Sequence, residues 1–131
     1  MIGLDTNLLI RYLTKDDRAQ YAKAKRLIDE AVEQEERLLI NCVVLCEVTW
    51  VLDTAYEYSR AEIADALDRI FDTAQFDIER AHEARQALGD FRSTKAGFAD
   101  ALIGRINCTL GATQTMTFDR DLEALDTFAV L

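Results

Sequence analysis

The chain has no proline, a single histidine and three cysteines among its 131 residues. It also lacks internal repeats, low-complexity runs and glycine- or serine-rich linkers, so nothing marks a domain boundary. Half of the residues are apolar, which at this length is enough to bury a hydrophobic core. We therefore expect one domain over residues 1–131.

No apolar run approaches the ~18 residues that a membrane span needs. Strand-like residues and Asp5 follow Met1 at once, where a signal peptide would carry a longer apolar segment. Cys42, Cys46 and Cys108 are odd in number and have apolar neighbours, which indicates reduced core thiols. We expect a soluble cytoplasmic protein with no membrane contact.

The single histidine limits two kinds of chemistry. A zinc site joining His82 to the cysteines is an alternative, but the spacing matches no familiar zinc pattern. Attack by an RNA's own 2′-hydroxyl usually needs a pair of acid/base side chains, most often histidines. Because His82 stands alone in a polar helical context, we expect it at the surface or in packing, not in catalysis.

Basic residues are also few relative to acids. The formal net charge is −9, which argues against nucleic-acid binding through a broad basic patch and indicates a basic partner or bound cations. A plainer interpretation is that stretches such as DEAVEQEE are simply solvated helix faces.

Helical and strand patterns alternate along the chain. Apolar residues recur with helical spacing at Ala24, Leu27, Ile28 and Ala31 and again at Ile63, Leu67, Ile70 and Phe71. Ser59 and Glu62 have the spacing of a capping box before the second helix. Short strands are predicted at residues 2–4, 38–40 and 76–78, around Met116 and in the final FAVL. This order predicts an α/β fold with a short parallel sheet of about four to five strands and helices on both faces.

Acidic residues follow two of these strands. Asp5 comes after the first strand and Asp119 after TMTF, at the carboxyl edge where ligands collect in open α/β sheets. In the helix containing CEVTWVL, the helical spacing predicts that Glu47 points inward among valines, while Asp53 faces water with Thr49. A buried carboxylate needs a cation, either a metal ion or an arginine in a salt bridge.

Asp100 is predicted at the edge of an apolar helical stripe that contains Ile103 and Leu110. Gly97 and Gly104 lie near the same side, where they allow either close helix packing or the approach of a ligand. Four acids, Asp5, Glu47, Asp100 and Asp119, thus converge on one sheet edge in this interpretation. Clustered carboxylates repel one another unless a cation lies between them, so the pattern predicts a Mg²⁺ or Mn²⁺ site for phosphodiester hydrolysis.

Four motifs then carry a family resemblance. LDTNLLIRYL, CEVTWVL, FADALIGR and TFDRDLEAL occur in the order and approximate spacing of PIN-domain ribonucleases, specifically VapC-type toxins of toxin–antitoxin pairs. The chain resembles that family nearly end to end. The resemblance implies a PIN-like domain and a metal-dependent endoribonuclease whose direct metal ligands are Asp5 and Asp100.

The resemblance also implies roles for other positions. Glu47 and Asp119 would hold the ion's water shell or a second ion, with Asn7 and Thr117 as polar supports. Asp121 lies close enough to Asp119 in sequence to share or replace its role.

The implied partners are RNA, a VapB-like antitoxin and a second copy of the chain. Candidate phosphate-binding residues lie near the motifs: Arg11, Arg92, Lys95, Arg105 and Arg120. They are also interpretable as ordinary surface charges. An antitoxin of this family wraps the toxin and often inserts a basic side chain among the acids, which suits an acidic toxin. Trp50, Tyr56 and Tyr58 are candidates for a homodimer interface, although core packing also explains Trp50.

Two rival functions remain. A catalytically inactive PIN-like module that binds a basic protein would keep the fold without the chemistry. A Mg²⁺-dependent phosphatase or receiver-like phosphoacceptor would also place an aspartate after the first strand, but neither LDTN nor TFDRD carries the Asp pair or lysine it needs. The sequence does not choose between transfer RNA and ribosomal RNA as the substrate.

Overall fold

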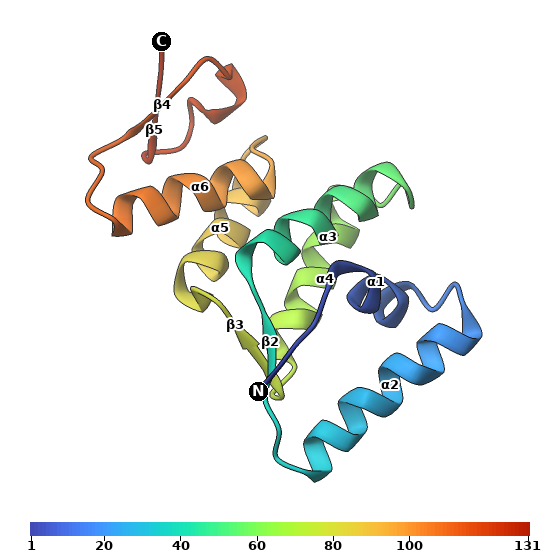
Figure 1. Ribbon diagram of the computed structural model, residues 1–131. Helices are drawn as coiled ribbons and strands as arrows, with labels where there is room; N and C mark the ends of the chain where they lie inside the picture. Colours follow the sequence, from blue (N-terminus) through green and yellow to red (C-terminus); the bar gives the residue numbers. More distant parts are fainter. The chain divides into compact units, whose positions relative to one another are not determined.

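Six α-helices and five short strands alternate along the chain in the computed structural model, which describes residues 1–131 (Figure 1). The chain forms two units, Met1–Arg80 and Ala81–Leu131. The first contains β1 (Ile2–Gly3), α1 (Thr6–Thr14), α2 (Arg18–Glu33), β2 (Leu38–Ile40), α3 (Cys42–Thr54), α4 (Arg60–Asp72) and β3 (Phe76–Ile78). The second contains α5 (Ala81–Ser93), α6 (Phe98–Thr109), β4 (Thr115–Thr117), a short 3₁₀ helix η1 (Arg120–Leu122) and β5 (Phe128–Val130).

All five strands pair in parallel, which confirms the predicted α/β class. In the first unit the order is β1-β2-β3, with Ile2 opposite Leu38 and Leu38 opposite Phe76. In the second unit β4 pairs with β5. Parallel neighbours require crossover connections, and here helices α1 and α2 connect β1 to β2 while α3 and α4 connect β2 to β3. The strands therefore divide into a three-stranded and a two-stranded sheet.

Burial within the first sheet follows strand position. The side chains of Leu38 and Ile40 in the central strand β2 are fully buried. Leu4 is buried, but Ile2 in β1 is 43% exposed. β1 is an edge strand of this sheet, and only the residue that follows it enters the core.

Both helices predicted from apolar spacing are present. Ala24, Ile28 and Ala31 are buried along α2. Ahead of α4, Ser59 and Glu62 form the predicted capping box, in which each side chain accepts the backbone N–H of the other residue. These local signals place α2 and α4 correctly because capping and periodicity need no knowledge of distant residues.

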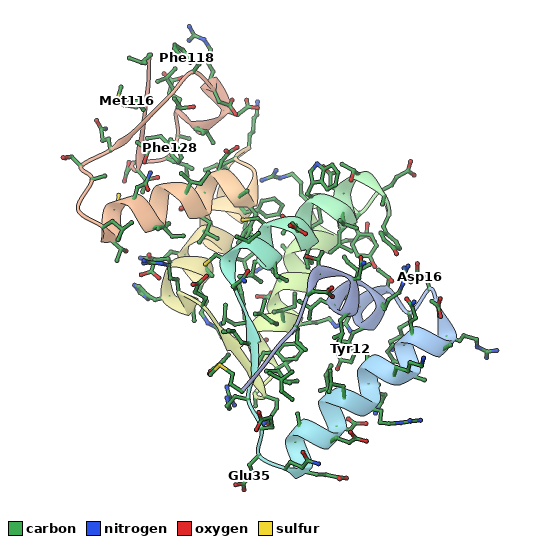
Figure 2. The ribbon with its side chains drawn as sticks, in the orientation of Figure 1. Tyr12, Asp16, Glu35, Met116, Phe118 and Phe128 are labelled. Atoms are coloured by element: carbon green, nitrogen blue, oxygen red, sulfur yellow. The ribbon has the colours of Figure 1, made fainter.

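A polar network holds α1 beside the end of α3. The Tyr56 hydroxyl donates to Asp16 Oδ2 at 2.6 Å, and Arg11 Nη1 donates to the same oxygen at 3.0 Å. Asp16 lies in the turn between α1 and α2, and Figure 2 labels it there. Nearby, the ring of Tyr12 stacks on that of Tyr21 with centroids 6.1 Å apart. The network fixes α1, whose first residue contacts α3.

In the second unit, α5 and α6 are joined by a bidentate ion pair. Arg105 donates from Nε and Nη2 to the two carboxylate oxygens of Asp90, both at 2.7 Å. Asp90 is buried, so this paired geometry satisfies a carboxylate that would otherwise be costly to bury.

The apolar face of α6 differs from the prediction. Its buried residues are Phe98, Ala101, Leu102 and Gly104. Leu102 is buried as the stripe requires, but Ile103 is 48% and Leu110 68% exposed, so the predicted stripe was wrong at these two positions. A Cβ on Gly104 would lie 2.6 Å from both Phe128 Cε2 and Thr127 Oγ1, which confirms the close-packing interpretation for this glycine. β5 packs directly on the α6 backbone there.

Several surface features bear on the remaining expectations. The three cysteines are free, but Cys108 is exposed and not a core thiol. Burial raises the pKa of the half-buried Cys42 thiol to about 11, with a further contribution from its hydrogen bond to Glu79.

The single histidine, His82, is exposed, as expected. No helix has the length and apolar composition that a membrane crossing requires.

Large apolar side chains are exposed in both units. Trp50 is 66% exposed, so core packing does not explain it. Met116 in β4 is half exposed and Phe118, just after the strand, is 82% exposed; Figure 2 labels both.

Candidate active site

Asp5 stands where the chain turns from β1 into α1. It is the N-cap of α1, with φ −95° and ψ 174°, and its Oδ1 accepts the Leu8 N–H at 3.1 Å. N-cap aspartates are stabilised by the free N–H groups and the positive end of the helix. The side chain is exposed, and the cap uses one of its oxygens. Capping therefore holds Asp5 in one orientation while Oδ2 remains available.

Glu47 lies on α3, but not on the face that the sequence predicted. The buried residues of α3 are Leu45, Val48, Thr49 and Leu52. Glu47 is exposed, so the inward orientation was wrong. The apolar residues of this helix surround most of its circumference, and the valines chosen as the core face were the wrong subset. Asp53 is exposed, as predicted, but Thr49, which was predicted to face water with it, is buried.

A hydroxyl connects Glu47 to the start of α1. Thr6 Oγ1 donates to Glu47 Oε2 at 2.9 Å. Because Thr6 directly follows Asp5, this contact brings residues 41 positions apart to the same end of α1. Asp5 and Glu47 thus belong to one local cluster in the first unit.

The second unit holds the other two acids. Asp100 lies in the first turn of α6 and is half-buried. Burial raises the pKa of the Asp100 carboxyl above its ordinary value, and the negative charge of Asp119 raises that pKa further. Asp100 and Asp119 thus interact electrostatically, and we call them the second acidic pair.

Asp119 is oriented by its own turn. As N-cap of η1, it accepts the Asp121 N–H at Oδ1 with a distance of 2.9 Å. Its own N–H donates to Thr117 Oγ1 at 3.0 Å, so Thr117 stabilises the turn that carries the acid. Asp121 acts here through its backbone, whereas the charge on Asp119 acts on Asp100.

Three of these acids are anchored by the same kind of hydrogen bond. Asp5, Glu47 and Asp119 each receive a hydrogen bond from a neutral donor at one carboxylate oxygen. No positive charge is used to hold them, so their negative charges remain to attract a cation. Neither unit by itself brings three acidic, histidine or cysteine side chains around one ion position. The donors are carboxylate oxygens, which suit hard ions such as Mg²⁺ and Mn²⁺.

Comparison with known proteins shows the family of the chain. Residues 2–127 match the family described as PIN domain. The chain belongs to the PIN domain family. The match spans both units of this PIN domain and includes all four acids. A relative described as a VapC ribonuclease from Aquifex aeolicus (strain VF5) is 21% identical over 122 residues, covering 93% of this chain and 90% of the relative.

Two of the five basic residues expected to bind RNA are held in ion pairs in this PIN domain. Arg11 pairs with Asp16, and Arg105 pairs with Asp90. Both guanidinium groups stabilise helix packing, which leaves fewer of their N–H donors for a phosphate.

The other three basic residues lie in the second unit. Lys95 and Arg120 line a surface groove of about 520 Å³ together with Ser93 and Thr94. Arg92 is exposed in the last turn of α5. The groove also includes Asp121, and Arg120 directly follows Asp119 in the chain, so this groove runs beside one acid of the candidate site.

Of the polar supports, Asn7 is exposed in the first turn of α1 and lines a separate groove between α1 and α2. Thr6 was missed by sequence reasoning altogether. A threonine beside a capping aspartate is ordinary at a helix start, and only the packing of α1 on α3 shows that its hydroxyl meets Glu47.

Proposed function

We propose that this PIN domain, residues 1–131 acting as one domain, is a Mg²⁺- or Mn²⁺-dependent endoribonuclease and the toxin of a type II toxin–antitoxin pair. It would hydrolyse phosphodiester bonds in transfer or ribosomal RNA in the cytoplasm, thereby inhibiting translation and growth. The observation that carries the proposal is the anchoring of the carboxylates. Three of the four acids are oriented by neutral donors, so no cationic side chain is used to hold them.

In this proposal Asp5 and Asp100 would hold the ion directly. The bound divalent cation would polarise a phosphoryl oxygen and lower the pKa of a water molecule. A bound cation would stabilise the ionised form of Asp100 in particular, because burial and the charge of Asp119 both disfavour that form when no cation is bound.

Glu47 and Asp119 would orient the attacking water. Each has one anchored oxygen and one oxygen free to accept a hydrogen bond from that water. Attack at phosphorus in line with the departing 3′-oxygen leaves a 5′-phosphate and a 3′-hydroxyl. Asn7 and Thr117 support this site, Thr117 through the turn at Asp119.

The charges of the chain support the choice of partners in this proposal. A chain with a net charge of −9 suits a basic VapB-like antitoxin that inserts a cationic side chain among the acids. RNA would be guided by local cations, with Lys95 and Arg120 along their shared groove as the first candidates. A homodimer would bury the exposed Trp50, with Tyr56 and Tyr58 nearby in sequence.

The first test is cleavage of total cellular RNA by purified protein, mapped by sequencing the new 5′ ends. Wild type is compared with Asp100→Ala, each in magnesium, in manganese and in EDTA. A matched control is Asp53→Asn, which removes an exposed acid from the helix that carries Glu47.

Discrete cuts by wild type and Asp53→Asn that disappear with EDTA and with Asp100→Ala are expected. Full RNA cleavage by Asp5→Asn in magnesium would contradict the acidic site. If wild type and Asp100→Ala are equally silent while both bind a basic partner, the inactive interaction module replaces the nuclease.

A further inference from the structure

Thr6 is the one residue that joins the start of α1 to an acid of the candidate site on another element. Its Oγ1 lies 2.9 Å from Glu47 Oε2 and donates to it. The backbone of Thr6 is fixed because Asp5 caps the helix immediately before it. A β-branched side chain in a helix has few χ1 choices, so the hydroxyl has a well-defined direction.

Glu47 needs such a contact more than the other acids do. Its side chain is exposed on α3, and a long exposed side chain samples many rotamers. Asp5 and Asp119 are short and are each anchored by a backbone N–H within three residues. The anchor of Glu47 comes from a different helix, so its position depends on the packing of α1 on α3.

The chemical type of the anchor matters as well. A lysine or arginine at this place would neutralise Glu47 and compete with a metal ion for it. The hydroxyl of Thr6 binds one oxygen, leaves the other free and leaves the carboxylate charge in place. This combination favours positioning for a cation over simple cross-linking of two helices.

We propose that Thr6 is a positioning residue that orients the Glu47 carboxylate toward the divalent ion or its water shell. This inference rests on the proposed metal-dependent nuclease function. Partners that orient a group at a metal site typically contribute 10- to 100-fold to metal affinity or activity. Removing the Thr6 hydroxyl should therefore cost about tenfold or more in the same quantities.

The experiment compares Thr6→Val, which keeps the shape, with Thr6→Ser, which keeps the hydroxyl. Thr54→Val is the matched control, because its hydroxyl donates to the Trp50 carbonyl within the helix that carries Glu47. Three quantities are measured for each protein: Mn²⁺ affinity by calorimetry, kcat and KM for a cleaved RNA, and the melting temperature in EDTA.

Thr6→Val is expected to lower Mn²⁺ affinity or kcat about tenfold or more, with KM for RNA within about twofold of wild type. Thr6→Ser keeps the hydroxyl, so its Mn²⁺ affinity and kcat should lie within about threefold of wild type. Thr54→Val should match wild type in both quantities. In a Glu47→Ala background, Thr6→Val should cause no further loss of Mn²⁺ affinity, since the group that it positions is gone.

Equal Mn²⁺ affinity and kcat in wild type and Thr6→Val would overturn the role of Thr6 and leave the nuclease proposal standing. An equal loss in the Glu47→Ala background, with a lowered melting temperature, would make the hydroxyl structural and also overturn it. If wild type neither binds Mn²⁺ nor cuts RNA, the proposed function fails, and the role of Thr6 fails with it.

Discussion

The two acidic pairs of this PIN domain are held by different physical means. In the first unit, Asp5 and Glu47 are exposed and are oriented by a helix N–H and a threonine hydroxyl. Neither contact changes the charge of a carboxylate. This pair therefore has a defined geometry without an ion pair.

In the second unit, Asp100 is half-buried beside a like charge. Burial and Asp119 both act against its ionised form, and its pKa is raised as a result. The ionised carboxylate of Asp100 is therefore destabilised, and a bound cation would offset this destabilisation. The two pairs therefore differ in energetics: the first is oriented by neutral hydrogen-bond donors, whereas the second includes a carboxylate whose ionised form is disfavoured.

The largest effect should come from Asp100→Asn. We expect cleavage of RNA to fall at least about a hundredfold, because a direct metal ligand is lost. In EDTA at pH 7, the same variant should be more stable than wild type, because it removes a disfavoured charge. Measuring single-turnover cleavage beside urea unfolding checks both outcomes.

Glu47→Gln is the matched comparison from the other pair. It should also lose cleavage, but it should show no gain of stability in EDTA. Equal gains for both variants would remove the distinction between the pairs, and normal cleavage by Asp100→Asn would remove Asp100 from the site.

The next effect concerns stabilisation by the ion. Saturating a native-state site at 100 times its dissociation constant raises the free energy of unfolding by about 2.7 kcal/mol. We expect manganese to raise the melting temperature of wild type accordingly and to leave that of Asp100→Asn nearly unchanged. Thermal unfolding at increasing Mn²⁺ concentration measures this. A full manganese response in Asp100→Asn would place the main binding energy outside the second unit.

Gly104→Ala tests the scaffold of the second pair. The new Cβ would lie 2.6 Å from Phe128 Cε2 and from Thr127 Oγ1, so α6 and β5 must separate slightly. Overpacking of this kind costs typically 1–3 kcal/mol. Urea unfolding should show that loss, whereas Gly89→Ala, where a Cβ meets no atom within 4 Å, should be neutral or slightly stabilising. Unchanged stability for Gly104→Ala would show that the packing adapts freely.

The sequence predicted features that depend on neighbouring residues. Asp5 and Asp119 were placed after strands, and both cap the short helices that follow. The capping box at Ser59 and the strands around Leu38 and Phe76 were also correct. In each case the signal lies within a few residues and reflects local hydrogen bonding or periodicity.

The features that the sequence did not predict depend on which elements meet. On α3 and α6, apolar residues occur on more than one side, so periodicity alone does not select the buried face. Glu47 was therefore assigned an inward orientation, and Ile103 a place in the core. The Thr6 contact joins residues 41 apart, and no local pattern carries such information.

The smallest effect is a pH dependence confined to the second pair. The pKa of Asp100 in the folded protein is raised above its ordinary value of 3.8, so the folded state binds more protons than the unfolded state between the two values. Stability then falls as pH rises through this range. In EDTA, the advantage of Asp100→Asn over wild type should be greatest near pH 7 and should vanish below about pH 4, where Asp100 is protonated in both states. Urea unfolding of the two proteins across this range gives the difference in stability, from which the contributions of the other titrating groups cancel.

A second comparison adds Asp119→Asn to both proteins. The stability gained by Asp100→Asn should then be smaller, because the like charge is removed while the burial of Asp100 remains. A constant difference at every pH would show that the charge of Asp100 costs nothing, and the contrast between the two pairs would then reduce to geometry alone.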